Sequence, residues 1–267
     1  MKKLLSFALA ALMVLVCVFS FTSCGKKGNT LDEVKKAGEL IVATSPDFPP
    51  FENLEGEDVV GIEVEILKKV CEKLGVKLTL KQMDFDSVLP GVTAGKFDCG
   101  MSGITVTESR QKNMLFTDPY FVAAQAIVVK AGSPITGKAD LAGKKVSVQT
   151  GTTAEEYCSE NGYTVSAFAA NSDAQTALLN GNVDAWVIDN LVGIAMVETY
   201  NQGKADDEKL VILSEAMTSE PYAFAFAFGS ETLVAEINKI QKAMIEDGTI
   251  AAIFAQFGED YAAPASK

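Results

Sequence analysis

The sequence contains no histidine and a single arginine, Arg110, among its 267 residues. The lack of histidine removes the commonest general base and the commonest transition-metal ligand of proteins. No catalytic triad, P-loop or zinc-binding spacing is present in its place. The composition therefore favours a binding protein over an enzyme, and it implies no metal and no cofactor.

Basic residues are also few: 23 lysines and arginines stand against 35 aspartates and glutamates, and the formal net charge is -12. This balance argues against nucleic-acid binding, which needs a positively charged surface. Of the five cysteines, only Cys71, Cys99 and Cys158 follow residue 24, and their spacing does not fit a metal site. We expect three buried free thiols rather than a disulfide, even though exported proteins often contain disulfides.

One long apolar run is present, and it lies at the N-terminus. It extends from Leu4 to Phe21, follows two lysines and precedes Thr-Ser-Cys at residues 22–24. This arrangement predicts an export signal over residues 1–23. Residues 21–24 resemble the lipobox of bacterial lipoproteins, which implies that Cys24 is lipidated and that residues 24–36 are a lipid-attached tether. An uncleaved membrane anchor is the alternative, because the run approaches the length that spans a bilayer.

From Leu31 onward, short β-branched runs alternate with segments of helical periodicity, which is the pattern of an α/β protein. The first unit predicts strands over residues 39–44, 77–82 and 98–101 and helices over residues 61–74 and 86–94. A second unit repeats this order, with strands over residues 145–149, 164–168 and 184–188 and helices over residues 154–161 and 172–180. We therefore expect two similar lobes, each a mixed sheet flanked by helices.

Two extended apolar runs, Phe121–Val129 and Tyr222–Phe228, are the candidates for connecting the lobes. If the chain passes from lobe 1 to lobe 2 in the first run and returns in the second, lobe 1 consists of residues 37–122 and 226–267. Lobe 2 then consists of residues 123–225. Two such hinge strands allow the lobes to close, and the ligands of hinged two-lobed proteins lie in the cleft between the lobes.

The only arginine follows a segment with the features of an anion-binding site. Residues 102–110 leave a strand, pass Gly103, whose lack of a side chain lets a ligand approach the backbone, and enter a helix at a capping threonine. Free N–H groups, a threonine hydroxyl and the Arg110 guanidinium can together bind a carboxylate. A solvated arginine on a helix face is the alternative, but the use of the only arginine at this position favours the site.

Seven motifs along the chain resemble those of the polar amino acid-binding proteins of ABC transporters. They are Gly61–Ile66, Asp84–Pro90, Ser102–Arg110, Phe116–Tyr120, Gly143–Val146, Gln149–Thr153 and Asp247–Thr249. They occur in the family's order across essentially the whole chain after the export signal. The resemblance implies a two-lobed periplasmic-binding-protein-like (type II) fold. It also implies an exported monomer, lipid-anchored on the outer face of the cytoplasmic membrane, that closes around a free amino acid and delivers it to the permease subunits of an ABC importer.

The resemblance also assigns residues to the ligand. Arg110 would bind the α-carboxylate, and Asp189 would bind the α-ammonium, with a helix N-cap as the alternative role of Asp189. Phe48 and Phe85 would enclose the ligand's side chain, although isolated phenylalanines more often lie in a core. The implied ligand-binding residues are Phe48, Phe85, Ser102, Gly103, Thr105, Arg110, Thr152, Thr153 and Asp189, and the implied side-chain pocket contains Ser45, Glu63 and Gln149.

One departure from the family pattern bears on the choice of ligand. Binders of basic amino acids in this family usually carry an aspartate where this chain has Ser45. A cationic side chain therefore loses its expected counter-ion, unless Asp47, Glu52 or Glu63 replaces it. An acidic side chain would need donors beyond Arg110. The sequence thus favours a neutral polar amino acid.

Two other functions fit parts of the pattern. Exported cyclohexadienyl dehydratases, which act on prephenate or arogenate, share this fold and many of these motifs. They need a general acid at the leaving hydroxyl, for which Glu63 is a candidate. A tethered sensory module would need a downstream membrane helix and a signalling domain, and neither is visible in the sequence.

Overall fold

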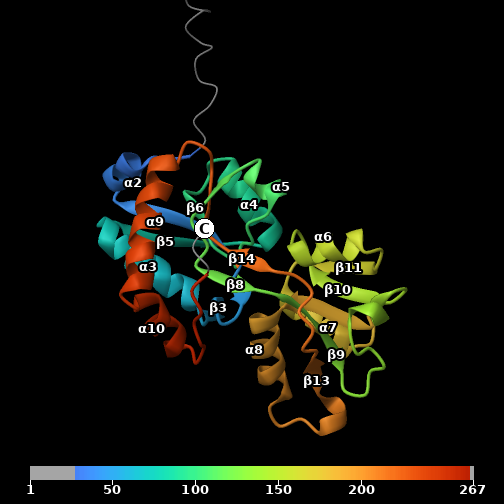
Figure 1. The fold of residues 1–267 in the computed structure, drawn as a ribbon. Coiled ribbons are helices and arrows are strands. Elements are labelled where there is room, and N and C mark those ends of the chain that lie inside the picture. Colours follow the sequence, from blue (N-terminus) through green and yellow to red (C-terminus); the bar gives the residue numbers. More distant parts are fainter. Residues whose placement is uncertain (1–27, 265–267) are drawn as a thin grey trace, which may run out of the picture.

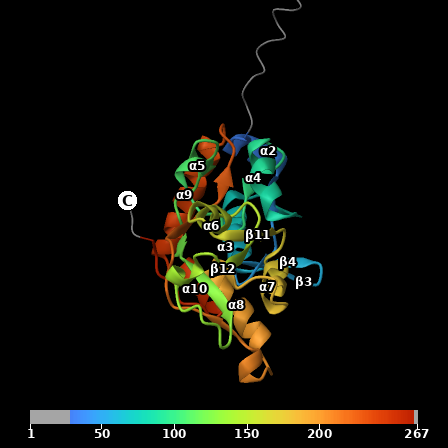
Figure 2. The same cartoon turned by 90° about the vertical axis from the view of Figure 1, so that its right-hand side faces the viewer.

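The structure is a computed structural model that describes residues 28–264 (Figure 1). The predicted export signal, Cys24 and the first part of the predicted tether lie outside these residues. Within residues 28–264, no helix combines the length and the apolar character needed to cross a bilayer. The described chain forms two α/β lobes, which Figure 2 shows from a second direction.

The first lobe is built on a five-stranded sheet. Its strand order is β5 (Lys77–Gln82), β1 (Glu39–Thr44), β6 (Cys99–Gly100), β15 (Ala225–Phe226) and β7 (Leu115–Phe116). The first three strands are parallel, whereas β15 runs antiparallel to both of its neighbours. The helices of this lobe are α2 (Leu31–Ala37), α3 (Ile62–Leu74), α4 (Phe85–Thr93), α5 (Glu108–Gln111), α9 (Glu231–Glu246) and α10 (Thr249–Gln256).

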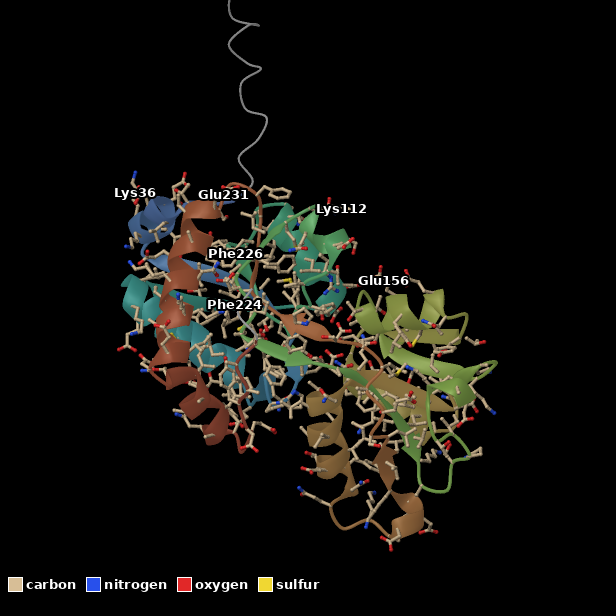
Figure 3. The ribbon with its side chains drawn as sticks, in the orientation of Figure 1. Lys36, Lys112, Glu156, Phe224, Phe226 and Glu231 are labelled. Atoms are coloured by element: carbon tan, nitrogen blue, oxygen red, sulfur yellow. The ribbon has the colours of Figure 1, made fainter. Side chains whose placement is uncertain are left out.

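Helices cover both faces of this sheet. Val42 of β1 packs in the apolar cluster that includes residues of α3 and α9, while the next residue, Ala43, packs in a separate cluster with Phe85 of α4. Successive residues of a strand point to opposite faces, so α3 and α9 cover one face and α4 covers the other. Phe224 and Phe226, labelled in Figure 3, are fully buried in the first cluster.

Glycines determine where α3 begins and ends. Gly61 at the N-cap has a φ of +143°, and a Cβ atom there would lie 2.1 Å from the carbonyl oxygen of Phe51, so only glycine fits. Gly75 ends the helix with a φ of 74°, in the left-handed region, and its N–H donates to the carbonyl of Cys71. The helix predicted from the periodicity is therefore confirmed.

The second lobe repeats the order of the three parallel strands of the first. Its sheet runs β11 (Thr164–Phe168), β10 (Lys145–Gln149), β12 (Ala185–Asp189), β9 (Gln125–Lys130) and β13 (Leu210–Ile212). β10 is parallel to β11 and β12, whereas β9 is antiparallel to β12 and β13. The helices are α6 (Thr153–Glu160), α7 (Asn171–Leu179) and α8 (Asn190–Asn201), with 3-10 turns at Lys138–Leu141 and Asp206–Glu208.

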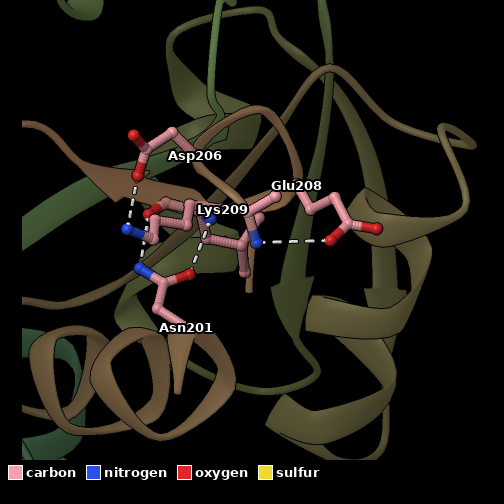
Figure 4. A network of polar contacts seen from close by, with 6 residues as sticks. Asn201, Asp206, Glu208 and Lys209 are labelled. Carbon is pink, nitrogen blue, oxygen red and sulfur yellow. Dashed lines mark hydrogen bonds and ion pairs between the residues drawn. The ribbon is translucent and has the colours of Figure 1, made fainter. Parts of the chain in front are cut away.

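A polar network ties the end of α8 to the start of β13 (Figure 4). Asn201 Nδ2 donates to the carbonyl of Leu210 at 2.9 Å, and the N–H of Leu210 donates to Asn201 Oδ1 at 2.9 Å. Lys209 Nζ lies 2.6 Å from Asp206 Oδ1. The Asn201 amide thus satisfies both backbone groups of a residue that begins an edge strand.

A two-stranded ribbon connects the two sheets. β8 (Phe121–Ala123) pairs antiparallel with β14 (Glu220–Tyr222). β8 leads directly into β9 of the second sheet, and β14 is followed by β15 of the first sheet (Figure 1). The chain therefore passes between the lobes twice, and the two passages are hydrogen-bonded to each other. A small sheet of β2 (Asp47–Phe48), β3 (Glu52–Glu55) and β4 (Asp58–Val60) extends the loop after β1.

The structure corrects the length of the predicted tether. Residues 31–36 were assigned to it, but they form most of α2, which packs against β1 and α9. The helix starts with a capping box between Thr30 and Glu33. This sequence pattern predicts the start of a helix rather than a tether. The three cysteines after residue 24 are buried and free, as expected.

Candidate functional site

A cavity of about 450 Å³, counting the part that opens to solvent, lies between the two lobes. The first lobe lines the cavity with Ser45, Phe48, Glu52, Phe85, Ser102, Gly103, Thr105 and Arg110, and the second with Gln149, Thr152, Thr153, Ala154, Asn171, Val187, Ile188 and Asp189. The structure thus brings together all the residues assigned to the ligand from the sequence, except Glu63.

The starts of three helices form the wall from the second lobe. β10, β11 and β12 are parallel, and the chain turns from their ends into α6, α7 and α8. Thr153, Asn171 and Asp189, which line the cavity, lie at these turns. The first N–H groups of a helix have no partner within the helix and carry a partial positive charge, so they attract the negative group of a ligand. Open parallel sheets commonly bind ligands at this edge.

Arg110 reaches the cavity from the first lobe and contacts both lobes. It lies in α5, where its backbone N–H donates to the hydroxyl of the N-cap residue Thr107 at 3.2 Å. Nη1 donates to the carbonyl of Thr105 at 3.0 Å, and Nη2 donates to the carbonyl of Gly151, in the second lobe, at 3.2 Å. Cζ lies 5.9 Å from the centroid of the Phe85 ring, within cation–π range. Two carbonyls and a ring therefore hold the guanidinium in place.

The surroundings of Arg110 are acidic. Burial lowers the pKa of Arg110, and the negative charges of Glu220, Glu156 and Asp189 raise it. Figure 3 labels Glu156 on the side of the second lobe that faces the first. Arginine stays protonated under all of these influences. The guanidinium is therefore a permanent cation whose donors can pair with a carboxylate.

Asp189 is the corresponding acid from the second lobe. It is 8% exposed and accepts a hydrogen bond from the hydroxyl of Tyr222 on β14. It occupies the N-cap position of α8, but its side chain makes no capping hydrogen bond. Burial, and then the charge of Glu220, raise the pKa of Asp189 to about 7, against the lowering effects of Tyr222 and Arg110. A ligand ammonium beside Asp189 would favour its ionised form.

The hydroxyl groups of Thr152 and Thr153 are used within the protein. Thr152 Oγ1 accepts from the N–H of Glu155 at 3.2 Å as the cap of α6. Thr153 Oγ1 donates to Glu220 Oε2 at 3.0 Å and accepts from Gln125 Nε2 at 3.0 Å. A ligand would therefore use the backbone N–H groups of this helix start rather than the hydroxyls.

Phe48 packs against Gly103. A Cβ atom on Gly103 would lie 2.4 Å from Phe48 Cε1, and Gly103 has a φ of +52°, so a larger residue would meet both a clash and backbone strain. Phe48 is half-buried and lines the cavity with part of its ring. Phe85, by contrast, is 6% exposed and packs in the core with Ile104, where it supports Arg110.

Hydrogen bonds orient the polar side chains on both walls. The N–H of Ser45 donates to Ser102 Oγ at 2.7 Å, and both serines are buried. On the opposite wall, Gln149 Nε2 donates to the carbonyl of Ala169 at 3.0 Å, and Gln149 Oε1 accepts from Asn171 Nδ2 at 3.0 Å. Hydrogen bonds within the protein therefore fix the orientation of these groups, and groups that are already oriented lose less entropy on binding.

Glu63 does not line the cavity, which corrects its assignment to the side-chain pocket. It is fully buried at the start of α3, where it accepts hydrogen bonds from the N–H of Gly103 at 2.9 Å and from the hydroxyl of Tyr120. Glu63 thus supports the Gly103 loop from within the first lobe. It is not placed to act as a general acid on a bound ligand.

Asn171 is a cavity residue that the sequence analysis missed. Its backbone N–H donates to Asp47 Oδ2, from the first lobe, at 2.5 Å, and Gln149 Nε2 lies 3.4 Å from Asp47 Oδ1. Asp47 therefore bridges the lobes. Burial raises the pKa of Asp47 to about 6, against the lowering effect of its hydrogen bonds. No sequence signal marks Asn171, because its role depends on how the second lobe faces the first.

Glu52 is the second polar residue that was not assigned to the ligand. It lies in β3 with its side chain fully buried, next to Ser102 and Glu63, whose hydrogen bonds act on its carboxyl group. Burial raises the pKa of Glu52 well above its usual value, and the charge of Glu63 raises it further. The only signal in the sequence was its position near Ser45, which made it one of three possible counter-ions.

Residues 40–260 match the model of the bacterial extracellular solute-binding proteins, family 3. The chain belongs to this family. It is also 33% identical over 244 residues to the arginine-binding extracellular protein ArtP of Bacillus subtilis (strain 168). The match covers 90% of this chain and 93% of ArtP.

Solved structures of similar proteins support the same assignment. The crystal structure of a mutant of ArgBP from T. maritima is 35% identical to this chain and matches it with a TM-score of 0.79. The match covers 85% of this chain and 98% of the ArgBP chain. The ancestral amino acid-binding protein AncCDT-1, described as a precursor of cyclohexadienyl dehydratase, is 32% identical with a TM-score of 0.78, over 86% of this chain and 99% of that one. The two-lobed α/β fold predicted from the sequence is therefore confirmed for this family 3 protein.

Proposed function

We propose that this family 3 solute-binding protein binds a free amino acid outside the cell and delivers it to the permease subunits of an ABC importer. The observation that carries the proposal is the presence of Arg110, from the first lobe, and Asp189, from the second, in one buried cavity. A buried charge without a partner costs several kcal/mol. An amino acid is a zwitterion and supplies a partner for each residue.

The α-carboxylate lies against Arg110 and the free N–H groups at the start of α6, and the α-ammonium lies against Asp189. Three observations support this orientation. Arg110 already donates a hydrogen bond to the carbonyl of Gly151, just before α6, and the first turn of α6 offers backbone N–H donors. The side chain of Asp189 makes no capping hydrogen bond to α8. Thr105 and Ser102 line the same space, and the ring of Phe48 borders it above Gly103. Contacts of this kind are compatible with micromolar binding, about -8 kcal/mol.

The lobes close around the ligand by bending at the ribbon of β8 and β14. In this proposal lobe 1 comprises residues 37–122 and 226–267, and lobe 2 comprises residues 123–225. The ribbon carries both chain crossings, and Tyr222 within it contacts Asp189, so the hinge adjoins the ligand site. A ligand that contacts both lobes stabilises the closed form, which the permease can then distinguish from the open form.

Binding rather than catalysis accounts best for this site. ArtP is named for arginine binding, whereas AncCDT-1 is described as the precursor of a dehydratase. The general acid that the sequence offered for dehydration, Glu63, does not line the cavity. We therefore expect no phenylpyruvate when the protein is incubated with prephenate.

The protein further acts, in this proposal, as a lipid-anchored monomer on the outer face of the cytoplasmic membrane, attached through Cys24. The lipobox-like residues 21–24 support the anchor. At the start of the described chain, the N–H of Gly28 donates to the carbonyl of Phe228 at 3.1 Å, so a tether before residue 28 joins the first lobe. Replacing Cys24 with serine should release the protein from the membrane fraction.

A thermal-shift screen against the common amino acids tests the proposed binding. A ligand at 100 times its dissociation constant should stabilise the protein by about 2.7 kcal/mol. The α-amide of the best ligand, which lacks the carboxylate charge, and its N-acetyl derivative, which lacks the ammonium, should give no shift. If no amino acid stabilises the protein, or if both derivatives bind like the parent ligand, the proposal is wrong.

A further inference from the structure

The ribbon between the lobes carries a buried acid, Glu220, that the proposed ligand contacts do not use. Glu220 begins β14, is 3% exposed and pairs with Ala123 of β8. It does not line the cavity. Burying a carboxyl group is costly unless hydrogen bonds and neighbouring charges compensate it, so the partners of Glu220 indicate its role.

Glu220 and Tyr222 lie two positions apart on β14, so their side chains point to the same side of the strand. Glu220 Oε2 accepts a hydrogen bond from Thr153 Oγ1, at the start of α6, at 3.0 Å. The hydroxyl of Tyr222 donates to Asp189, at the start of α8. One strand of the ribbon therefore contacts both helix starts that the proposed function assigns to the α-groups of the ligand.

A second hydrogen bond fixes the hydroxyl of Thr153. Gln125 Nε2, at the start of β9, donates to Thr153 Oγ1 at 3.0 Å. The N–H of Gln125 in turn donates to Thr218 Oγ1 at 3.1 Å, and Gln125 is fully buried. Thr153 is therefore attached to both segments of the chain that pass between the lobes.

The same strand is joined to the part of the site that belongs to the first lobe. Thr105 forms a β-bridge with Tyr222, and the carbonyl of Thr105 accepts a hydrogen bond from Arg110 Nη1 at 3.0 Å. Among the negative charges that raise the pKa of Arg110, that of Glu220 has the largest effect. Glu220 therefore acts on the α-carboxylate contact of the first lobe as well as on the second lobe.

We propose that Glu220 is a positioning residue of the amino acid site, which fixes the start of α6 through Thr153 and places a negative charge near Asp189. The inference rests on the proposed function and states how the ribbon prepares both α-group contacts. Glu220 does not touch the ligand. It acts through Thr153, whose backbone N–H group faces the α-carboxylate, and through Asp189, which binds the α-ammonium.

The charge of Glu220 links ligand binding to pH. Burial, and then the charge of Glu220, raise the pKa of Asp189 to about 7, whereas the hydroxyl of Tyr222 and the charge of Arg110 lower it. Without a ligand, Asp189 is therefore largely protonated below about pH 7. When the ammonium of an amino acid binds, the O–H bond of Asp189 breaks and the proton passes to the buffer. Binding should weaken as the pH falls below about 7.

Calorimetry at pH 8 and pH 5.5 tests the effect of this charge. The probe is the common amino acid, histidine excepted, that stabilises the unaltered protein most in the thermal-shift screen. Its affinity for the unaltered protein should be roughly 30-fold lower at pH 5.5 than at pH 8, as expected for an acid with a pKa of about 7. Glu220→Gln removes the charge and lowers the pKa of Asp189, so the ratio should fall below about tenfold. A purely structural role of Glu220 would leave the ratio unchanged. Asp47, whose pKa is about 6, contributes equally to every variant.

Variants at Glu220 and Thr153 test the hydrogen bond at pH 8. Glu220→Ala removes the acceptor and should weaken binding by about tenfold. Glu220→Gln keeps an oxygen for the hydroxyl of Thr153, so it should lose far less. Thr153→Val should cause a loss similar to that of Glu220→Ala, and Thr153→Ser, which keeps the hydroxyl, should recover most of it. The double variant Glu220→Ala/Thr153→Val should lose little more than either single variant, because both substitutions remove the same contact.

Glu160→Gln is the matched control. Glu160 is exposed at the far end of α6, and its substitution removes the same charge as Glu220→Gln. Both the affinity and its dependence on pH should stay unchanged in this variant. Thermal unfolding checks that each variant folds. If Glu220→Ala does not fold, the pH dependence of Glu220→Gln and the two Thr153 variants decide the question.

Each result has a distinct meaning. If the affinity of Glu220→Gln depends on pH as steeply as that of the unaltered protein, the inference is overturned while the proposed function stands. The same holds if Thr153→Val binds as tightly as the unaltered protein at pH 8, or if the losses of Glu220→Ala and Thr153→Val add in the double variant. If no amino acid binds the unaltered protein, the proposed function and the inference are both overturned.

Discussion

The two lobes contribute to the cavity in different ways. The first lobe presents side chains from loops and a short sheet, among them Phe48, Glu52 and Arg110. The second lobe presents the starts of α6, α7 and α8, with Asp189 as its only ionisable cavity residue. Backbone N–H groups at helix starts suit any α-carboxylate, whereas side chains differ in what they accept. In the proposed function, Arg110 and the second lobe hold the α-groups of the amino acid, and the other side chains of the first lobe contact its side chain.

The walls also complement each other directly. Asp47 of the first lobe accepts a hydrogen bond from the N–H of Asn171 at the start of α7, where the helix dipole favours a negative group. Arg110 of the first lobe donates to the carbonyl of Gly151 in the second. These two hydrogen bonds join the lobes directly, and a ligand that contacts both lobes would add to them. Four substitutions test this comparison.

Arg110→Ala should have the largest effect. It removes the cation that the first lobe contributes to the α-carboxylate, and affinity for the best amino acid should fall at least about 100-fold. Arg110→Lys keeps the charge but loses the planar fork, so it should recover only part of the affinity. Calorimetry measures both variants. If the Arg110→Ala variant binds the amino acid within threefold of the original affinity, the helix starts alone hold the α-carboxylate.

Asp189→Asn removes the acid of the second lobe and should weaken binding by roughly 10- to 100-fold. It should also change the dependence of stability on pH. The pKa of Asp189 is about 7 in the folded protein and near 3.8 in the unfolded chain, so the folded state binds this proton more tightly. Stability of the ligand-free protein should therefore fall as the pH rises from about 4 to 7, and Asp189→Asn should remove part of that fall, on the order of 2 kcal/mol.

Denaturant unfolding at pH 5 and pH 7.5 checks the effect on stability. Asp47 also has a raised pKa, to about 6, so a smaller slope should remain in the variant. Asp207→Asn, at an exposed position, is the control and should keep the full slope. If the free energy of unfolding changes with pH equally in the original protein and in Asp189→Asn, the raised pKa is wrongly assigned to Asp189.

Gly103→Ala tests the contact between backbone and ring in the first lobe. The added methyl group meets Phe48 and also strains a positive φ, so binding should weaken by about tenfold and stability should fall by about 1–2 kcal/mol. Gly132→Ala is the matched control, because Gly132 has a φ of +76° but no atom within 4 Å of the added Cβ. The difference between the two variants, measured by thermal unfolding and calorimetry, isolates the role of Phe48.

Asp47→Asn should have the smallest effect. It weakens the contact between the lobes at the start of α7, and the affinity should fall by about two- to fivefold, the size of a helix-dipole interaction. Small-angle scattering should show a larger average radius of gyration for the ligand-free variant. An unchanged radius and affinity would mean that the bridge does not contribute to closure.

The sequence predicted the elements well where the signals are local. The helix expected over residues 154–161 is α6, Thr153–Glu160, and the helix expected over residues 172–180 is α7, Asn171–Leu179. Turn and capping residues specify such ends from within a few positions. The Arg110 segment was found in the same way, because its strand end, glycine and capping threonine lie next to one another in the chain.

Local sequence patterns did not predict the positions of three residues: Glu63, Glu52 and Asn171. Glu63 and Glu52 are both acids near the same loop, and pattern alone could not tell that one is turned into the first lobe and the other toward the cavity. Asn171 meets Asp47 across the cleft, 124 positions away in the sequence. Nothing local to either residue reports such a contact.

The sequence by itself determined the α/β elements and their repeated order along the chain, and the family resemblance pointed to Arg110 and Asp189, which the structure places on one cavity. The elements follow from periodicity and capping, which are properties of neighbouring residues, whereas the role of Asp189 came only from the resemblance. Only the tertiary structure decided which carboxyl group lines the cavity and which lies within the first lobe, because hydrogen-bond partners and burial arise when distant segments pack. That decision separates Glu52, which lines the cavity, from Glu63, which does not.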